Sequence, residues 1–182
     1  CACSTWVSER ERNIRRKIIF RIILIWLKIL QNGKQDTVGI SNLLKGGKLT
    51  ESVNSRGETD GEMVLKNGSV TLLDTMVISL KRTCGEYQQI PLATIIGPAT
   101  GSAGEQLTII LSTRKNSILI GENTAGYVTA NNGFLLPGKN NGIVIGESYT
   151  RDKNGRIYFE DVSPTIKVTG GDDFLHLQND KN

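Results

Sequence analysis

The segment around Ser102 constrains the fold of this chain more than any other part of the sequence. Residues 90–97 (IPLATIIG) form a continuous apolar run of strand length, which is typical of a strand buried on both faces. Residues 97–101 (GPATG) end that run, and Leu107, Ile110 and Leu111 then recur at helical spacing. The pattern predicts a strand, a tight turn that carries Ser102, and a helix.

A second apolar run of strand length, residues 117–121, follows this helix closely. We expect the helix to end near residues 113–116, where Arg114 and Lys115 would complement the negative end of the helix dipole. A strand, a helix and a strand joined by short connections make a βαβ unit. The sequence therefore predicts an α/β layered fold.

The remaining elements are predicted from glycine and asparagine turn signals. Residues 38–44 fit a short helix that ends at Gly46 and Gly47, and residues 48–69 fit a hairpin or loop excursion. Residues 72–80 fit a helix or a strand. Asn-Gly signals at 131–133, 139–142 and 152–155 predict three short strands separated by turns.

The first thirty residues combine basic and apolar side chains. The apolar run 17–30 contains Arg21 and Lys28, and it is shorter than the roughly 20 apolar residues that span a bilayer. We expect a core strand or an amphipathic helix there, and no transmembrane span. Cys1 is compatible with a lipidated mature N-terminus, although we favour an arbitrary start of the sequence.

Composition excludes several classes of function. The net charge is +4, aromatic residues make up only 5% of the chain and no basic motif with interleaved aromatics appears, so we expect no nucleic-acid partner. The three cysteines, with a single histidine, predict neither a disulfide framework nor a metal site. We expect no cofactor. At 182 residues the chain suits one domain with a real core.

The predicted turn before the helix suits a nucleophile. The hydroxyl of Ser102 would emerge at the N-terminus of the helix, where free N–H groups and the dipole stabilise a developing oxyanion. Glycines on both sides (GSAG) permit a sharp turn and a close approach of substrate. A serine that only caps a helix is common, however, so this pattern alone leaves both interpretations open.

Several motifs, in order and spacing, resemble the tail-specific (carboxy-terminal processing) protease family. They are residues 101–105 (GSAGE), 121–126 (GENTAG), 131–137 (NNGFLLP), 149–158 (YTRDKNGRIY) and 162–164 (VSP). Residues 38–44 are similar to the family's GLSPLL segment, and Thr165 replaces the last residue of its I-x-P-D motif. The resemblance implies a ClpP/crotonase-like layered β-β-α core, incomplete at both ends.

The family resemblance assigns roles to residues near the turn. Ser102 matches the nucleophile, and the N–H of Ala103 matches one oxyanion donor. The resemblance further implies that substrate is bound by Gly101, Gly104, Thr124 and Ala125.

The family activates its serine in two ways. One branch uses a lysine, but Tyr127 occupies that position here, so this sequence excludes the lysine dyad there. The other branch, which is similar to the tricorn core, uses an upstream histidine and a downstream glutamate. Glu160 lies where that glutamate belongs, with Asp161 as a less favoured substitute. The single histidine, His176, lies downstream of Ser102 and does not match the family's base.

The N-terminal part of the chain departs from the family pattern. The family's D-L-R-x-N-x-G-G segment, which supplies the second oxyanion N–H, is absent before Val38. We therefore divide the chain into an atypical segment, residues 1–37, and a portion of the protease core, residues 38–182. We expect the residues before about Asp36 to come from a shifted reading frame or an internal restart.

Two functions follow as expectations. The first is a serine-type peptidase that cleaves peptide or protein substrates through an acyl-enzyme on Ser102, with weak or absent activity because the upstream histidine is missing. The second is a non-catalytic remnant that binds peptides along a strand edge. The family weakly suggests an extracytoplasmic or membrane-associated location, and the oligomeric state stays open.

Overall fold

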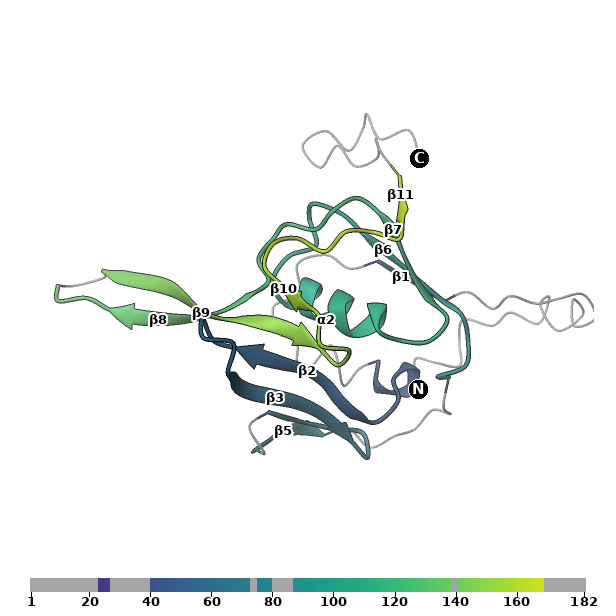
Figure 1. Cartoon of the computed structure of the whole chain (residues 1–182), viewed down its shortest axis with the longest axis horizontal. Coiled ribbons are helices and arrows are strands. Elements are labelled where there is room, and N and C mark those ends of the chain that lie inside the picture. Colours follow the sequence, from purple (N-terminus) through teal and green to yellow (C-terminus); the bar gives the residue numbers. More distant parts are fainter. Residues whose placement is uncertain (1–22, 27–39, 73–74, 80–86, 139–140, 169–182) are drawn as a thin grey trace, which may run out of the picture.

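The computed structural model describes residues 23–26, 40–72, 75–79, 87–138 and 141–168 as two β-sheets and one α-helix (Figure 1). One sheet has the strand order β1-β6-β7-β11, and its strands are parallel. The other is antiparallel with the order β10-β9-β2-β3-β4-β5, and β8 pairs with β9. The elements are β1 (Ile23–Trp26), η2 (Ser41–Leu43), β2 (Gly47–Val53), β3 (Thr59–Lys66), β4 (Ser69–Leu72), β5 (Thr75–Ser79), β6 (Leu92–Ile96), α2 (Ala103–Ser112), β7 (Ser117–Gly121), β8 (Thr129–Leu135), β9 (Gly142–Asp152), β10 (Ile157–Tyr158) and β11 (Ile166–Lys167).

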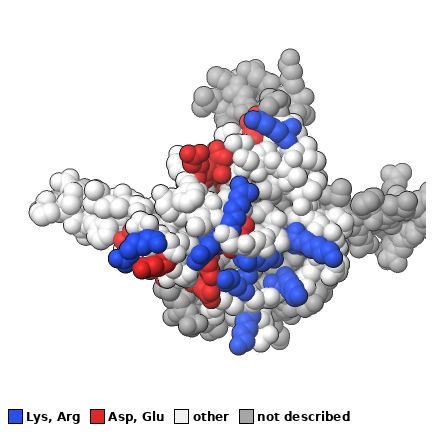
Figure 2. All heavy atoms as spheres, viewed as in Figure 1, with Lys and Arg blue, Asp and Glu red and all other residues white. Residues whose placement is uncertain are grey.

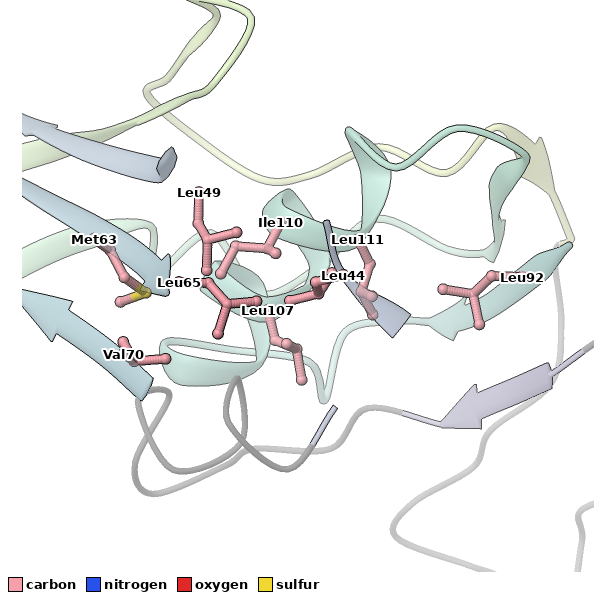
Figure 3. Close-up of a cluster of buried hydrophobic side chains, with 9 residues drawn as sticks. All are labelled: Leu44, Leu49, Met63, Leu65, Val70, Leu92, Leu107, Ile110 and Leu111. Carbon is pink, nitrogen blue, oxygen red and sulfur yellow. The ribbon is translucent and has the colours of Figure 1, made fainter. Parts of the chain in front are cut away.

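Helix α2 lies between the two sheets and contributes to both parts of the core. On one side, apolar helix residues pack against the antiparallel sheet, in the cluster Leu44, Leu49, Met63, Leu65, Val70, Leu92, Leu107, Ile110 and Leu111 (Figure 3). On the other side, Ile109 joins a second cluster with Ile96, Leu119, Val128, Tyr158 and Val162. A helix that is buried on two sides has apolar residues around most of its circumference.

The predicted α/β fold and its central unit are confirmed. Strand β6 and strand β7 lie side by side in parallel, with Leu92 opposite Ser117 and Ile96 opposite Gly121. Helix α2 connects them. Four of the five residues of β6 are buried, and Leu92 and Ile96 pack in clusters with residues of α2, but Ile95 is 36% exposed, so the predicted burial on both faces is only partial.

The antiparallel sheet also confirms several turn predictions. Residues 48–69 contain the hairpin of β2 and β3 followed by the turn into β4, where Asn67 and Gly68 both have positive φ angles. The ambiguous stretch 72–80 contains strand β5. Residues 152–155 form the turn between β9 and β10.

Three local predictions were wrong in part. Residues 41–43 form only a 3-10 helix, and Leu44 is already extended. Residues 131–133 do not form a turn but lie inside β8. The pairing of β8 with β9 shifts register between Ala130 and Asn131, so the strand continues past this point with a local irregularity. Helix α2 ends at Ser112, so Arg114 lies beyond its last turn. The side chain of Arg114 instead donates hydrogen bonds to carbonyls of other segments.

The apolar run near the N-terminus contains a strand, one of the two alternatives expected there. Strand β1 pairs in parallel with β6, with Ile23 opposite Leu92 and Trp26 opposite Ile95. Residues 1–22 and 27–39, which hold all the basic side chains of the first thirty residues, lie outside the described residues. Among the residues that are described, no helix is long and apolar enough to cross a membrane.

The hairpin of β8 and β9 extends away from the body of the molecule (Figure 1). All described residues between 131 and 147 are exposed on it. They include large apolar side chains, namely Phe134, Leu135, Leu136, Ile143, Val144 and Ile145. Only the last part of β9, Tyr149–Asp152, pairs with β2 and returns to the core.

Candidate functional site

Ser102 lies at the junction between β6 and α2, where the chain turns from the parallel sheet into the helix. Its backbone angles are φ 51° and ψ −113°, a conformation that L-residues rarely adopt. The residue is exposed, while its neighbours Gly101 and Gly104 are buried. A strained serine at a sharp strand-to-helix turn is the arrangement that presents a nucleophilic hydroxyl above a sheet.

Gly101 is required by close packing and not by its backbone angle. A Cβ atom there would lie 3.0 Å from Cδ2 of Tyr127 and 3.3 Å from Cβ of Ala125. Among the two glycines and the serine of this turn, only Ser102 has a positive φ. The sequence argument that glycines permit the turn is therefore corrected: the strain falls on the serine, and Gly101 makes room for the neighbouring loop.

The buried carboxylate of Glu105 holds the turn by hydrogen bonds. Its side chain is fully buried, and Oε2 accepts a hydrogen bond of 2.9 Å from the backbone N–H of Ser102. Oε1 accepts hydrogen bonds from the hydroxyl of Thr124 at 2.5 Å and from the N–H of Gly126 at 2.7 Å. One carboxylate thus connects the nucleophile turn with the loop that follows β7.

The loop after β7 is connected to two further segments. The Thr124 hydroxyl accepts a hydrogen bond of 2.8 Å from the N–H of Val162, and the N–H of Ala125 donates to the carbonyl of Thr100 at 2.8 Å. The side chain of Thr124 is therefore buried and engaged within the protein. These contacts show that Thr124 holds the loop in position. A contact of Thr124 or Ala125 with substrate stays a prediction.

Ala103 is the first residue of α2, directly after Ser102. The N–H groups in the first turn of a helix have no intrahelical acceptor, and they lie at the positive end of the helix dipole. This geometry suits an oxyanion donor. The family segment that supplies the second donor has no match before Val38 in this sequence.

The residues at the positions that the family uses to activate its serine lie in different surroundings. Tyr127 is exposed, and its ring covers Gly101 beside the nucleophile. Glu160 is exposed, whereas Asp161 accepts a hydrogen bond of 3.0 Å from the Asn123 side chain in the loop after β7. No described contact brings either carboxylate to Ser102. His176 lies outside the described residues.

Sequence reasoning quoted Glu105 as part of a motif but missed its role. A signal was present, because Ser-x-x-Glu at the start of a helix is the capping-box pattern, in which the glutamate binds the N-cap N–H. That pattern predicts the bond to the N–H of Ser102. It does not predict the bonds to Thr124 and Gly126, since these come from a loop about twenty residues later. Among the described residues, no group of acidic, histidine and cysteine side chains is arranged to hold a metal ion.

Comparisons with known proteins agree with this architecture. Residues 34–168 match the model of peptidase family S41. A lipoprotein from Streptococcus agalactiae has a similar structure, with a TM-score of 0.64 and 20% sequence identity over 88% of this chain and 54% of that chain. The photosystem II D1 C-terminal processing protease is similar with a TM-score of 0.53 and 18% identity, over 81% of this chain and 34% of that chain. Among curated protein sequences, none matches this chain significantly.

The chain therefore spans about half or less of the length of these similar structures. At this level of identity the similarity establishes the fold, and it confirms the ClpP/crotonase-like layered core that the motifs implied. The family match covers the turn at Ser102, the loop after β7 and the segment up to Val168, and leaves residues 1–33 outside. On this evidence the chain belongs to peptidase family S41, a family of serine peptidases.

Proposed function

We propose that this chain hydrolyses peptide bonds through an acyl-enzyme formed on Ser102. The observation that carries the proposal is the backbone of Ser102, which holds an exposed serine in a rare conformation at the N-terminus of a buried helix. In that position the hydroxyl oxygen attacks a substrate carbonyl from the open side of the turn. The developing oxyanion accepts a hydrogen bond from the N–H of Ala103 and is stabilised by the positive end of the α2 dipole.

Glu105 acts in this proposal as a positioning residue. Its carboxylate accepts a hydrogen bond from the backbone N–H of Ser102, and this bond helps to fix the turn that presents the serine. The same carboxylate holds the loop at Thr124 and Gly126, beside which we propose that substrate lies. A fixed nucleophile requires less reorganisation when substrate binds.

The sequence has no histidine before Ser102 to act as the family's general base, so we expect turnover of the chain as it stands to be low. Tyr127 at the lysine position supports placement in the histidine-dependent, tricorn-core-like branch of the tail-specific proteases. In that branch Glu160 serves as the supporting carboxylate. Without a base, a neutral serine hydroxyl is a poor nucleophile, and the remaining rate enhancement comes from the oxyanion site and binding.

We further propose peptide or protein substrates and an extracytoplasmic location. Support for the location comes from the similar structure that is described as a lipoprotein. We also propose that residues 38–182 supply the catalytic portion, and the family match over residues 34–168 supports this.

Labelling with a fluorophosphonate probe tests the proposed nucleophile. We expect slow, time-dependent labelling of the wild-type chain and none of Ser102→Ala. Glu160→Gln should be labelled at the wild-type rate, as should Glu147→Gln, a change at another exposed glutamate, because Glu160 would act through a histidine that no residue before Ser102 supplies. Equal labelling of wild type and Ser102→Ala would contradict the acyl-enzyme proposal.

The non-catalytic alternative predicts a different pair of results. Because the described residues bring no base to Ser102, a peptide-binding role without chemistry is the second candidate. In that case the wild-type chain would not be labelled, yet it would bind extended peptides with the same affinity as Ser102→Ala. Fluorescence anisotropy with an unstructured peptide measures this affinity.

A further inference from the structure

A cavity of about 270 Å³ lies at the C-terminal end of α2, at the opposite end of the helix from Ser102. Segments that are distant in sequence surround it, from η2, the start of β2, the loop before β6, the end of α2 and the turn after β9. Its lining residues are Leu43, Leu44, Lys45, Leu49, Gln88, Gln89, Ile110, Thr113, Arg114, Lys115 and Lys153.

The lining is strongly positive. It contains Lys45, Arg114, Lys115 and Lys153, and no aspartate or glutamate. Figure 2 shows Lys and Arg side chains gathered around the end of β9, the strand that Lys153 follows. The C-terminal end of α2 contributes a negative partial charge of about half an elementary charge. Four cations outweigh that charge, so the cavity favours an anion.

Arg114 is the buried member of this group. It is 8% exposed, and its side chain donates only to backbone carbonyls. Nε donates to Leu43 at 2.7 Å, and Nη2 donates to Tyr87, Gln88 and Ile90 at 2.8, 2.9 and 2.5 Å. Nη1 is buried without a hydrogen-bond partner. Within the described part of the chain, no carboxylate pairs with this guanidinium.

Backbone carbonyls accept hydrogen bonds from Nε and Nη2 of Arg114, but they do not neutralise the charge of its guanidinium. Burial lowers the pKa of the guanidinium, because the charged form has lost water without gaining an opposite charge. A buried charge without a counter-ion is costly, and a guanidinium binds carboxylate and phosphate well. The missing counter-charge is what a ligand in this cavity would provide.

The remaining lining is part polar, with Gln88, Gln89 and Thr113, and part apolar. Leu44, Leu49 and Ile110 are buried members of the core cluster and also line the cavity. A volume of about 270 Å³ is close to the lower limit of ligand pockets, roughly 300 Å³. The space therefore suits a small molecule with a short hydrocarbon part, and not a folded partner.

We propose that this cavity binds a small organic anion, with its carboxylate or phosphate near Arg114 and the surrounding lysines and its hydrocarbon part against Leu44, Leu49 and Ile110. A carboxylic acid and a phosphate ester share this chemistry. The site is separate from Ser102, since a helix of ten residues spans about 15 Å. The proposal does not depend on the proposed peptidase activity.

Isothermal titration calorimetry of the full chain at fixed ionic strength tests the site. The probes are butyrate and inorganic phosphate, with butanol as the neutral analogue of butyrate. We expect saturable binding of at least one of the two anions and none of butanol. Preference for one anion identifies the acidic group that the site takes. The absence of saturable binding by both anions would overturn the proposal, as would binding of butanol as tight as that of butyrate.

A pair of matched variants locates the binding. Lys45→Gln/Lys115→Gln removes two exposed charges from the lining and should weaken anion binding about fivefold or more. Lys66→Gln/Lys167→Gln removes two exposed charges elsewhere and should leave the affinity unchanged. Equal affinity of the two double variants would place binding outside the cavity and contradict the proposal. Ser102→Ala should bind like wild type.

Arg114→Lys supplies a second measurement, because it keeps the charge and loses the planar fork. We expect this variant to bind the anion more weakly and to unfold at lower urea concentration. Anion addition should also raise the unfolding midpoint of the wild-type chain, because a ligand that binds only the folded state stabilises it. If the anion raised the unfolding midpoint of the two double lysine variants equally, that result would contradict binding in the cavity.

Discussion

At the scale of single residues, the turn before α2 concentrates strain on Ser102. The positive φ of this residue is stored energy, since a Cβ atom is crowded in that conformation. The buried hydrogen bonds of Glu105 hold the turn in place against this strain. The two residues therefore have opposite effects on stability, and each effect is measurable.

Replacement of Ser102 by glycine should relieve the strain. We expect Ser102→Gly to be more stable than Ser102→Ala by about 1–2 kcal/mol, measured by urea unfolding. This reverses the usual order, in which glycine is the less stable residue. Ser163 is an exposed serine with an ordinary φ, so Ser163→Gly should be no more stable than Ser163→Ala. The same order at both positions would show that Ser102 is not strained.

Replacement of Glu105 by glutamine should destabilise the chain by about 1–3 kcal/mol. The amide NH2 group would replace one acceptor oxygen and face a donor, either the N–H of Ser102 or the Thr124 and Gly126 pair. The measurement is the free energy of unfolding in urea. Glu147→Gln at an exposed position is the control, and it should change stability by less than about 0.5 kcal/mol. Equal effects of the two changes would mean that Glu105 does not hold the turn.

At the scale of elements, the parallel strands β6 and β7 are in close contact where they end. A Cβ atom on Gly121 would lie only 2.1 Å from the carbonyl oxygen of Ile96, and φ at Gly121 is +124°. The N–H of Glu122 donates to that same carbonyl at 3.1 Å. Close contact at this point brings the loop after β7 to the turn that carries Ser102.

Gly121→Ala should therefore be severely destabilising, by about 3 kcal/mol or more, because both the backbone angle and the clash oppose it. Thermal unfolding measures the effect as a large drop in Tm. Gly97→Ala is the control, since a Cβ there meets nothing within 4 Å and φ is not positive. A similar Tm for the two variants would contradict the close contact of β6 and β7 at Gly121.

The elements were more predictable from sequence than the site. The run of buried residues in β6 and the helical spacing of Leu107 and Ile110 are local patterns, and they predicted a strand and a helix correctly. The role of Glu105 depends on donors from Thr124 and Gly126, which only the folded chain brings together. Asn-Asn-Gly at 131–133 failed as a turn signal, because pairing with β9 overrides the local preference.

At the scale of the whole molecule, the pairing of β2 with β9 joins the strands before the βαβ unit to those after it. Glu51 on β2 lies between two cations, with Oε1 at 2.5 Å from Nζ of Lys48 and Oε2 at 2.6 Å from Nε of Arg151 on β9. The hydrogen bond from Lys48 and the charge of Arg151 lower the pKa of this carboxyl below 4.5. Acid should therefore weaken this connection.

The sign of the pH effect follows from the lowered pKa. Because the folded state holds the ionised carboxylate better than the unfolded state, Glu51 stabilises the chain above pH 4.5 and loses this contribution as the pH falls through the folded-state pKa. Solvent screening limits the contribution to about 1 kcal/mol. Glu51→Gln should lower stability more at pH 7 than at a pH well below the folded-state pKa, measured by urea unfolding at both values. An equal loss at both pH values would exclude an ionic contribution.

The extended hairpin of β8 and β9 has a practical consequence for work on this protein. Its described residues between 131 and 147 bury no side chain in the core, so the tip near Pro137 and Gly138 is a suitable place to insert a peptide tag or a fluorophore. A probe attached there stands away from the body that carries Ser102. The chain can then be immobilised or imaged by this arm while the nucleophile turn faces solution.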